Sequence, residues 1–97
     1  MVTAIVLCTV DRRHIPETAQ ALLAVPEVSE VYSVAGDWDI VAMLRVREHE
    51  HLADVVTQKL ASIDTIARTT TLIAFRAYST YDLERLFAVG ADDGREA

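Results

Sequence analysis

The chain has 97 residues, which fits one domain and leaves no room for a second. Its formal net charge of −6 excludes a large basic surface for nucleic acid and disfavours docking to anionic lipid. The single cysteine, Cys8, excludes an internal disulfide, and no stretch reaches the roughly 18 apolar residues of a membrane-spanning helix. We therefore expect a soluble cytoplasmic protein with no direct nucleic-acid or membrane partner.

The first part of the chain predicts a strand followed by a helix. Residues 2–10 are apolar and rich in β-branched side chains, almost without polar alternation, as in a strand that is covered on both faces. Pro16 then stands where the first turn of a helix tolerates proline. Apolar residues recur on one helical face as far as Leu23, and Val25-Pro26 ends the helix.

The middle of the chain predicts two paired strands and a second helix. Residues 28–35 and 39–46 are strand-like, and Gly36-Asp37 between them is typical of a tight turn, because glycine adopts a positive φ. Residues 48–63 place apolar side chains at helical spacing, which predicts a helix over that whole range.

The last part of the chain predicts a long strand over residues 66–77. A capping box at Ser79 then predicts a short amphipathic helix, which Gly90 ends. Residues 91–97 have nothing to bury, so we expect a disordered tail. The expected organisation is therefore one domain over residues 1–90 and a tail over 91–97.

The order of elements is β-α-β-β-α-β with a short C-terminal helix, which predicts a ferredoxin-like α+β fold. Both helices should pack on one face of a four-stranded antiparallel sheet and leave its other face open. Hydrophobic residues make up 52% of the chain, more than one small domain can hide. Two sheets stacked face to face would cover the excess, which predicts a dimeric α/β barrel.

The turn around Gly36 is the most informative candidate site. Asp37 and Asp39 offer acceptors for an ammonium group, backbone N–H groups of the turn offer donors for a carboxylate, and Trp38 offers a cover. Such a turn could therefore hold an amino acid. The alternative is a plain hairpin turn with a tryptophan that packs in the core.

A threonine run on the last predicted strand, Thr69 to Thr71, is a second candidate. Hydroxyl groups there can line a polar pocket, and the alternative is ordinary β-propensity on a half-exposed strand. His49 and His51 are two residues apart and so point in different directions on a helix, which disfavours a metal site. No catalytic motif is present, so we expect no metal, no cofactor and no enzymatic activity.

The chain resembles the effector-binding domain, often called the RAM domain, of the Lrp/AsnC transcriptional regulators. The resemblance covers about residues 2–87. It is carried by Gly36 with Asp39 in the hairpin, by Arg68-Thr69 with Thr71 in the last strand, and by the stretches VYSVAGDWDIVAMLRV and IARTTTLIAF.

The resemblance implies a homodimer through the open sheet faces, and dimers that join into an octamer or similar ring. It implies an amino acid bound between neighbouring dimers by Gly36, Asp37, Trp38 and Asp39, with Thr69 and Thr71 nearby. The family regulators carry a helix-turn-helix before this domain. Because the first strand starts at Val2, we expect a stand-alone sensor domain, which could co-assemble with a full-length regulator.

Two other functions stay open on the sequence alone. Small monooxygenases of the dimeric α+β barrel class share this topology, and such an enzyme would need a pocket between helices and sheet. A purely structural partner of a related regulator would use the same interfaces with an empty pocket.

Overall fold

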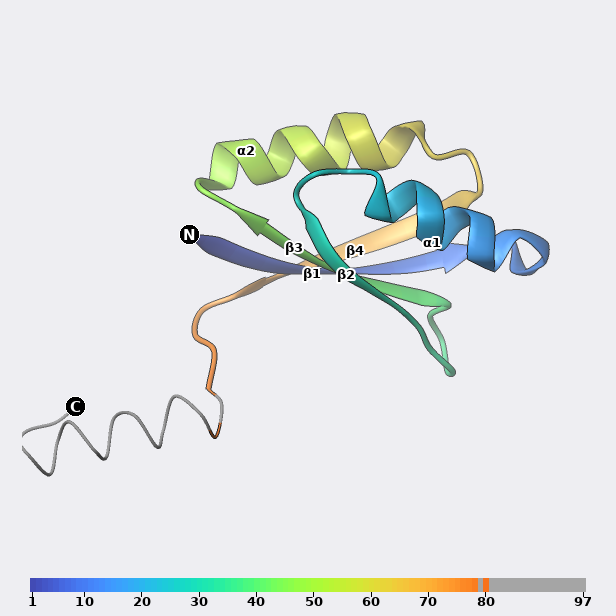
Figure 1. Ribbon diagram of the computed structural model, residues 1–97, viewed down its shortest axis with the longest axis horizontal. Helices are drawn as coiled ribbons and strands as arrows, with labels where there is room; N and C mark the ends of the chain where they lie inside the picture. The colour runs from blue at the N-terminus through green and yellow to red at the C-terminus, as the bar shows by residue number, and fades with distance from the viewer. Residues whose placement is uncertain (79, 81–97) are drawn as a thin grey trace, which may run out of the picture.

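The computed structural model describes residues 1–78 and 80. Four antiparallel strands form one sheet, and two helical segments lie over one of its faces (Figure 1). The main elements are β1 (Val2–Val10), α1 (Ile15–Leu23), β2 (Val28–Ser33), β3 (Ile40–Val46), α2 (His49–Asp54) and β4 (Ile66–Ala74). This is the predicted ferredoxin-like α+β fold. Among the described residues, no helix is long and apolar enough to cross a membrane.

The strands lie in the order β2-β3-β1-β4, so the first strand of the chain is central. β1 pairs antiparallel with β3, Val6 opposite Ala42, and with β4, Val6 opposite Thr71. The β1–β4 register shifts near Thr9, where a bulge adds one residue to β4. β2 and β4 are left as the two edges.

Alternate residues of β1 are buried and half-exposed. Ala4, Val6 and Cys8 are fully buried against the helices, whereas the residues between them lie on the opposite side of the sheet. The sequence predicted a strand that is covered on both faces, but within one chain the helices cover only one. We call the uncovered side the open face; its large apolar residues are Ile5, Leu7, Tyr32, Val41, Met43 and Leu72.

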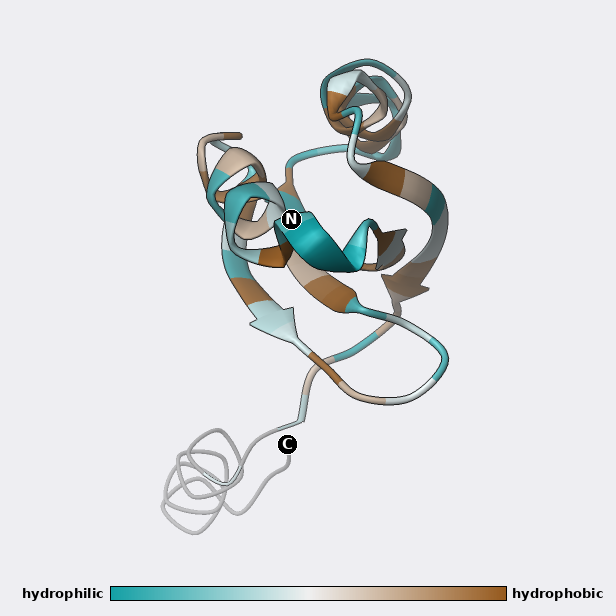
Figure 2. Cartoon of the chain, turned by 90° about the vertical axis from the view of Figure 1, so that its right-hand side faces the viewer, coloured by the Kyte–Doolittle hydropathy of each residue, from teal (hydrophilic) through white to brown (hydrophobic). Residues whose placement is uncertain are grey.

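The core lies between the covered face and the helices. Leu22 from α1 and Leu52 from α2 meet the buried side chains of β1 and β3 there. Cys8 is part of this core, and burial raises the pKa of its thiol to about 11. Figure 2 shows hydrophobic segments, in brown, along both the strands and the helices.

The second helix is less regular than predicted. The sequence predicts one helix over 48–63, but α2 is followed by a π-helical turn, η2 (Val55–Lys59), and a 3₁₀ turn, η3 (Leu60–Ser62). Val55 and Leu60 are both buried although they are five residues apart. A π-helical turn, whose hydrogen bonds join residues five apart, puts both on the core side.

The strand ends also differ from prediction. β2 stops at Ser33 instead of residue 35, and β4 stops at Ala74 instead of residue 77. At these ends the chain runs past its pairing partners: Ser33 is the last residue of β2 opposite β3, and Ala74 the last of β4 opposite β1. The predicted C-terminal helix and the tail over 91–97 lie outside the described residues.

Candidate ligand-binding site

The turn between β2 and β3 is built on Gly36. Its φ of +116° lies in a region that L side chains rarely adopt, so glycine is required by the backbone conformation. Apart from its chain neighbours, no atom lies within 4 Å of the position a Cβ would take, so crowding is not the reason. The turn closes where the Val34 N–H donates to the Asp39 carbonyl at 3.0 Å.

Asp39 fastens this turn to the end of β1. Its Oδ2 accepts a hydrogen bond from the backbone N–H of Val10 at 2.8 Å, and its Oδ1 lies 3.8 Å from Nε of Arg12. The backbone N–H of Asp39 also donates to the Cys8 carbonyl at 2.9 Å. Only 18% of the Asp39 side chain is exposed. Asp39 is therefore engaged in structure, whereas Asp37 in the same turn is exposed.

This difference predicts opposite effects for two alanine substitutions. Asp39→Ala removes a charged acceptor from a partly buried N–H and should lower the free energy of unfolding by about 1–2 kcal/mol. Asp37→Ala should change it by less than about 0.5 kcal/mol, because it removes an exposed side chain. Urea unfolding followed by circular dichroism measures both. Equal losses would show that Asp37 also holds the turn.

Trp38 lies against Arg68 of β4. The guanidinium carbon of Arg68 is 4.9 Å from the centre of the Trp38 ring, a cation–π contact between the hairpin turn and a strand two positions away in the sheet. The sequence places Arg68 in a family pattern but not beside Trp38. Only the strand order brings them together, and no local pattern reports that order.

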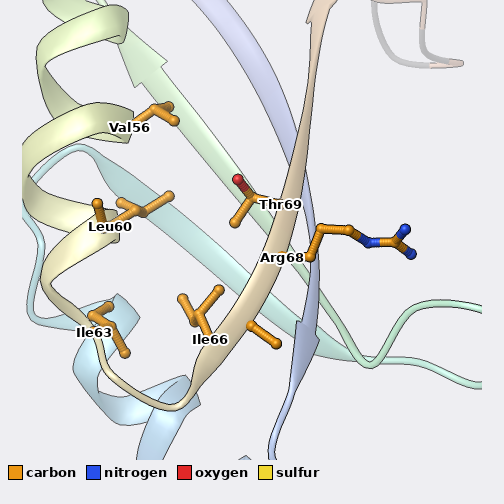
Figure 3. A pocket seen from close by; sticks show the side chains of 8 residues that line it. Val56, Leu60, Ile63, Ile66, Arg68 and Thr69 are labelled. Carbon is orange, nitrogen blue, oxygen red and sulfur yellow. The ribbon is translucent and has the colours of Figure 1, made fainter.

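A cavity of about 250 Å³ lies on the other side of β4, between that strand and the end of the second helix (Figure 3). In Figure 3 Thr69 points toward the helix, and Arg68 points away from the cavity. Six of the eight residues that line the cavity are apolar, and the other two are Arg68 and Thr69; the lining residues are Val56, Leu60, Ala61, Ile63, Ile66, Ala67, Arg68 and Thr69.

The six predicted site residues therefore fall into two groups. Thr69 and Thr71 are opposite Cys8 and Val6, so they share the helix-covered face. Gly36 to Asp39 lie in the hairpin turn, whose Trp38 contacts Arg68, and Arg68 is opposite Thr9 on the open face. One chain does not bring the two groups into a single pocket.

Glu27 holds the helical wall of the cavity. Its carboxylate contacts Nε2 of His51 at 2.7 Å and Nζ of Lys59 at 3.0 Å, which ties α2 and η2 to the turn before β2. The hydrogen bond from Lys59 is the main cause that lowers the pKa of Glu27. His51 is thus a hydrogen-bond partner of Glu27, and no cluster of three possible metal ligands occurs in residues 1–78 and 80.

Comparison with known proteins identifies the family. The protein family described as "Lrp/AsnC ligand binding domain" matches residues 3–83, which is most of the chain. The chain belongs to the Lrp/AsnC ligand-binding domain family. The curated relatives that match the chain are HTH-type transcriptional regulators and not enzymes, which argues against the monooxygenase alternative.

Three relatives show how far the likeness extends. The crystal structure of TTHA0845 from Thermus thermophilus is 44% identical, with 81% of this chain and 99% of that one covered and a TM-score of 0.76. An HTH-type transcriptional regulator of Pyrococcus furiosus is 36% identical over 59 residues, 61% of this chain and 39% of its own. A feast or famine regulatory protein from M. tuberculosis, complexed with L-methionine, is 28% identical, with coverages of 82% and 54% and a TM-score of 0.69. The chain thus spans only 39% of the length of that Pyrococcus regulator.

Proposed function

We propose that this Lrp/AsnC domain binds an amino acid and passes that signal on by self-assembly. The observation that carries the proposal is the relative complexed with L-methionine, which shares 28% of its residues and this fold. The acidic charge of −6 fits a domain that acts through protein partners instead of touching DNA itself. Its place of action is then the cytoplasm, where regulators of this family would meet it.

The open face supports pairing of two copies. It carries apolar side chains on all four strands, and Tyr32 and Leu72 at its edges are nearly half exposed. Charged groups stay at the rim, where Nη1 of Arg45 donates to Oγ1 of Thr3 at 3.2 Å. An apolar centre with a polar rim is the usual composition of a subunit interface.

The separation of the two residue groups supports a pocket shared between copies. Thr69 lines the cavity between β4 and the second helix, but Asp37 of the same chain belongs to the turn beside the opposite face of β4. If a second copy placed its hairpin turn beside this cavity, the two groups of predicted site residues would lie in one pocket. The cavity would take the apolar side chain, and Asp37 would take the ammonium group of the ligand.

A thermal-shift panel against the twenty amino acids tests this function. A ligand at about 100 times its dissociation constant adds about 2.7 kcal/mol to the folded state, which should raise the melting temperature by several degrees. Asp37→Ala and Thr69→Val should each remove the shift, because each deletes a polar group that the ligand needs. Asp37→Ala should leave the stability of the unliganded protein almost unchanged, so a lost shift in this variant reports lost binding.

The outcomes separate binding from assembly. A shift with one or two chemically related amino acids, lost in both variants, supports the pocket. A flat panel with an intact oligomer contradicts amino-acid sensing and favours a purely structural partner of a related regulator.

A further inference from the structure

The tip of the β2–β3 turn, residues 35–38, is fastened differently from its base. At the base, the Val34 N–H donates to the Asp39 carbonyl, and the Asp39 carboxylate accepts a hydrogen bond from the Val10 N–H. Residues 35–38 make no hydrogen bond in the part of the chain that the structure describes. Asp37, the candidate partner of the ligand's ammonium group, belongs to this tip, so its position depends on contacts of another kind.

A cation–π contact joins the tip to the sheet. The guanidinium carbon of Arg68 lies 4.9 Å from the centre of the Trp38 ring. Trp38 is half-buried, although Gly36 and Asp37 in the same turn are exposed. β1 lies between β4 and β3, so a side chain on β4 has to span most of two strand spacings, roughly 10 Å, to meet the turn. The contact therefore depends on the length of the arginine as well as on its charge.

A β-bulge in β4 directs Arg68 toward Trp38. Ile66 and Arg68 are two residues apart and would share one face of a regular strand. The register shifts between them, so that Ile66 is opposite Val10 and Arg68 is opposite Thr9. Ile66 consequently lines the cavity on the helix side, whereas the Arg68 side chain points away from it (Figure 3). Bulges of this kind re-aim side chains beside functional sites in many proteins.

We propose that Arg68 is a positioning residue of the ligand site: its guanidinium holds the Trp38 ring, and the held ring fixes Asp37 for the ligand. The proposal rests on the amino-acid binding under Proposed function and names a residue that supports it without touching the ligand. Asp37 and Trp38 are neighbours in the chain, so release of the ring from β4 frees the Asp37 carboxylate to move. A carboxylate that is fixed beforehand loses less conformational freedom when a ligand binds.

Fluorescence of the full chain tests the contact. Trp38 is the only tryptophan, so its emission reports on the tip of the turn. Arg68→Ala should shift the emission to longer wavelength and increase quenching by acrylamide, because the ring loses its cover. Arg68→Lys keeps a cation and should restore part of both signals. Arg45→Ala is the matched control, since it removes the same charge from the open face at the other end of β1, opposite Thr3, and should change neither signal.

Calorimetric titration with L-methionine, the amino acid bound by the M. tuberculosis relative, connects this contact to the ligand. Arg68→Ala should raise the dissociation constant about two- to thirtyfold, the range that corresponds to the strength of a cation–π contact. Arg68→Lys should recover part of this loss, and Arg45→Ala should stay within about twofold. Circular dichroism and light scattering check that every variant keeps its fold and its molar mass.

The possible outcomes separate this proposal from the proposed function. A changed Trp38 emission together with weaker binding, both partly restored by Arg68→Lys, supports the positioning role. If Arg68→Ala binds L-methionine as tightly as the unmodified protein does, the amino-acid site stands and the positioning role is overturned. If the unmodified protein binds neither L-methionine nor any other of the twenty amino acids, both proposals fail, and a changed emission then shows only that Arg68 supports the turn.

Discussion

Leu22→Ala should lower the free energy of unfolding by about 3 kcal/mol. Leu22 is fully buried between α1 and the sheet, so truncation leaves a cavity among close-packed neighbours. For a domain of this size that loss corresponds to a melting temperature lower by about 12–24 °C. Because small domains have only about 5–15 kcal/mol of stability in total, the variant should be close to marginal.

Leu23→Ala is the control for this prediction. It makes the same substitution one position further along the same helix, at a side chain that is 54% exposed. We expect a loss below about 1 kcal/mol, because no closed cavity forms. Urea titration of both variants compares them directly. Equal losses would mean that α1 packs on the sheet by a different face.

Leu7→Lys should convert the assembled protein to monomers. Leu7 is opposite Val41 on β3 and Thr70 on β4, at the middle of the open face. In a face-to-face pair the two lysines would be buried close to each other without partners, and an unpaired buried charge is strongly unfavourable. In the monomer the same lysine can extend its head group into water, so the fold should persist.

Light scattering coupled to size-exclusion chromatography measures this effect. We expect the molar mass of Leu7→Lys to fall to that of one chain at concentrations where the unmodified protein is at least a dimer. Leu23→Lys adds the same charge on the helix side and should leave the mass unchanged. A dimer that survives Leu7→Lys would show that the copies meet through another surface.

The order of strands and helices was predictable because each element carries its own local signal. The β-branched run of β1, the proline near the start of α1 and the glycine turn before β3 each act over a few residues. The resemblance to the family predicted how these elements assemble into the complete fold, and the structure and the comparisons confirm that fold. The π-helical turn was missed, because it depends on which side chains the sheet buries, not on local spacing.

The arrangement of the candidate site was less predictable. From the sequence alone, Asp37 and Asp39 are equivalent candidate acceptors. The pairing of β1 with β3 places Asp39 beside Val10, whose N–H donates to the Asp39 carboxylate. Thr69 and Arg68 are neighbours in sequence and so point to opposite faces of β4. Which of the two faces carries the cavity depends on where the helices pack, and this is a tertiary property.

The central position of β1 has a consequence for how the chain folds. β1 is made first, yet its partners β3 and β4 begin at Ile40 and Ile66. During synthesis the β2–β3 hairpin can form from local contacts, and β1 can pair with β3 once Val46 has been made. The other edge of β1 stays unpaired until β4 follows. Release of β4 from the ribosome is therefore the event that closes the sheet, and a chain cut short before β4 would keep β1 as an exposed edge strand that is prone to pair with other chains.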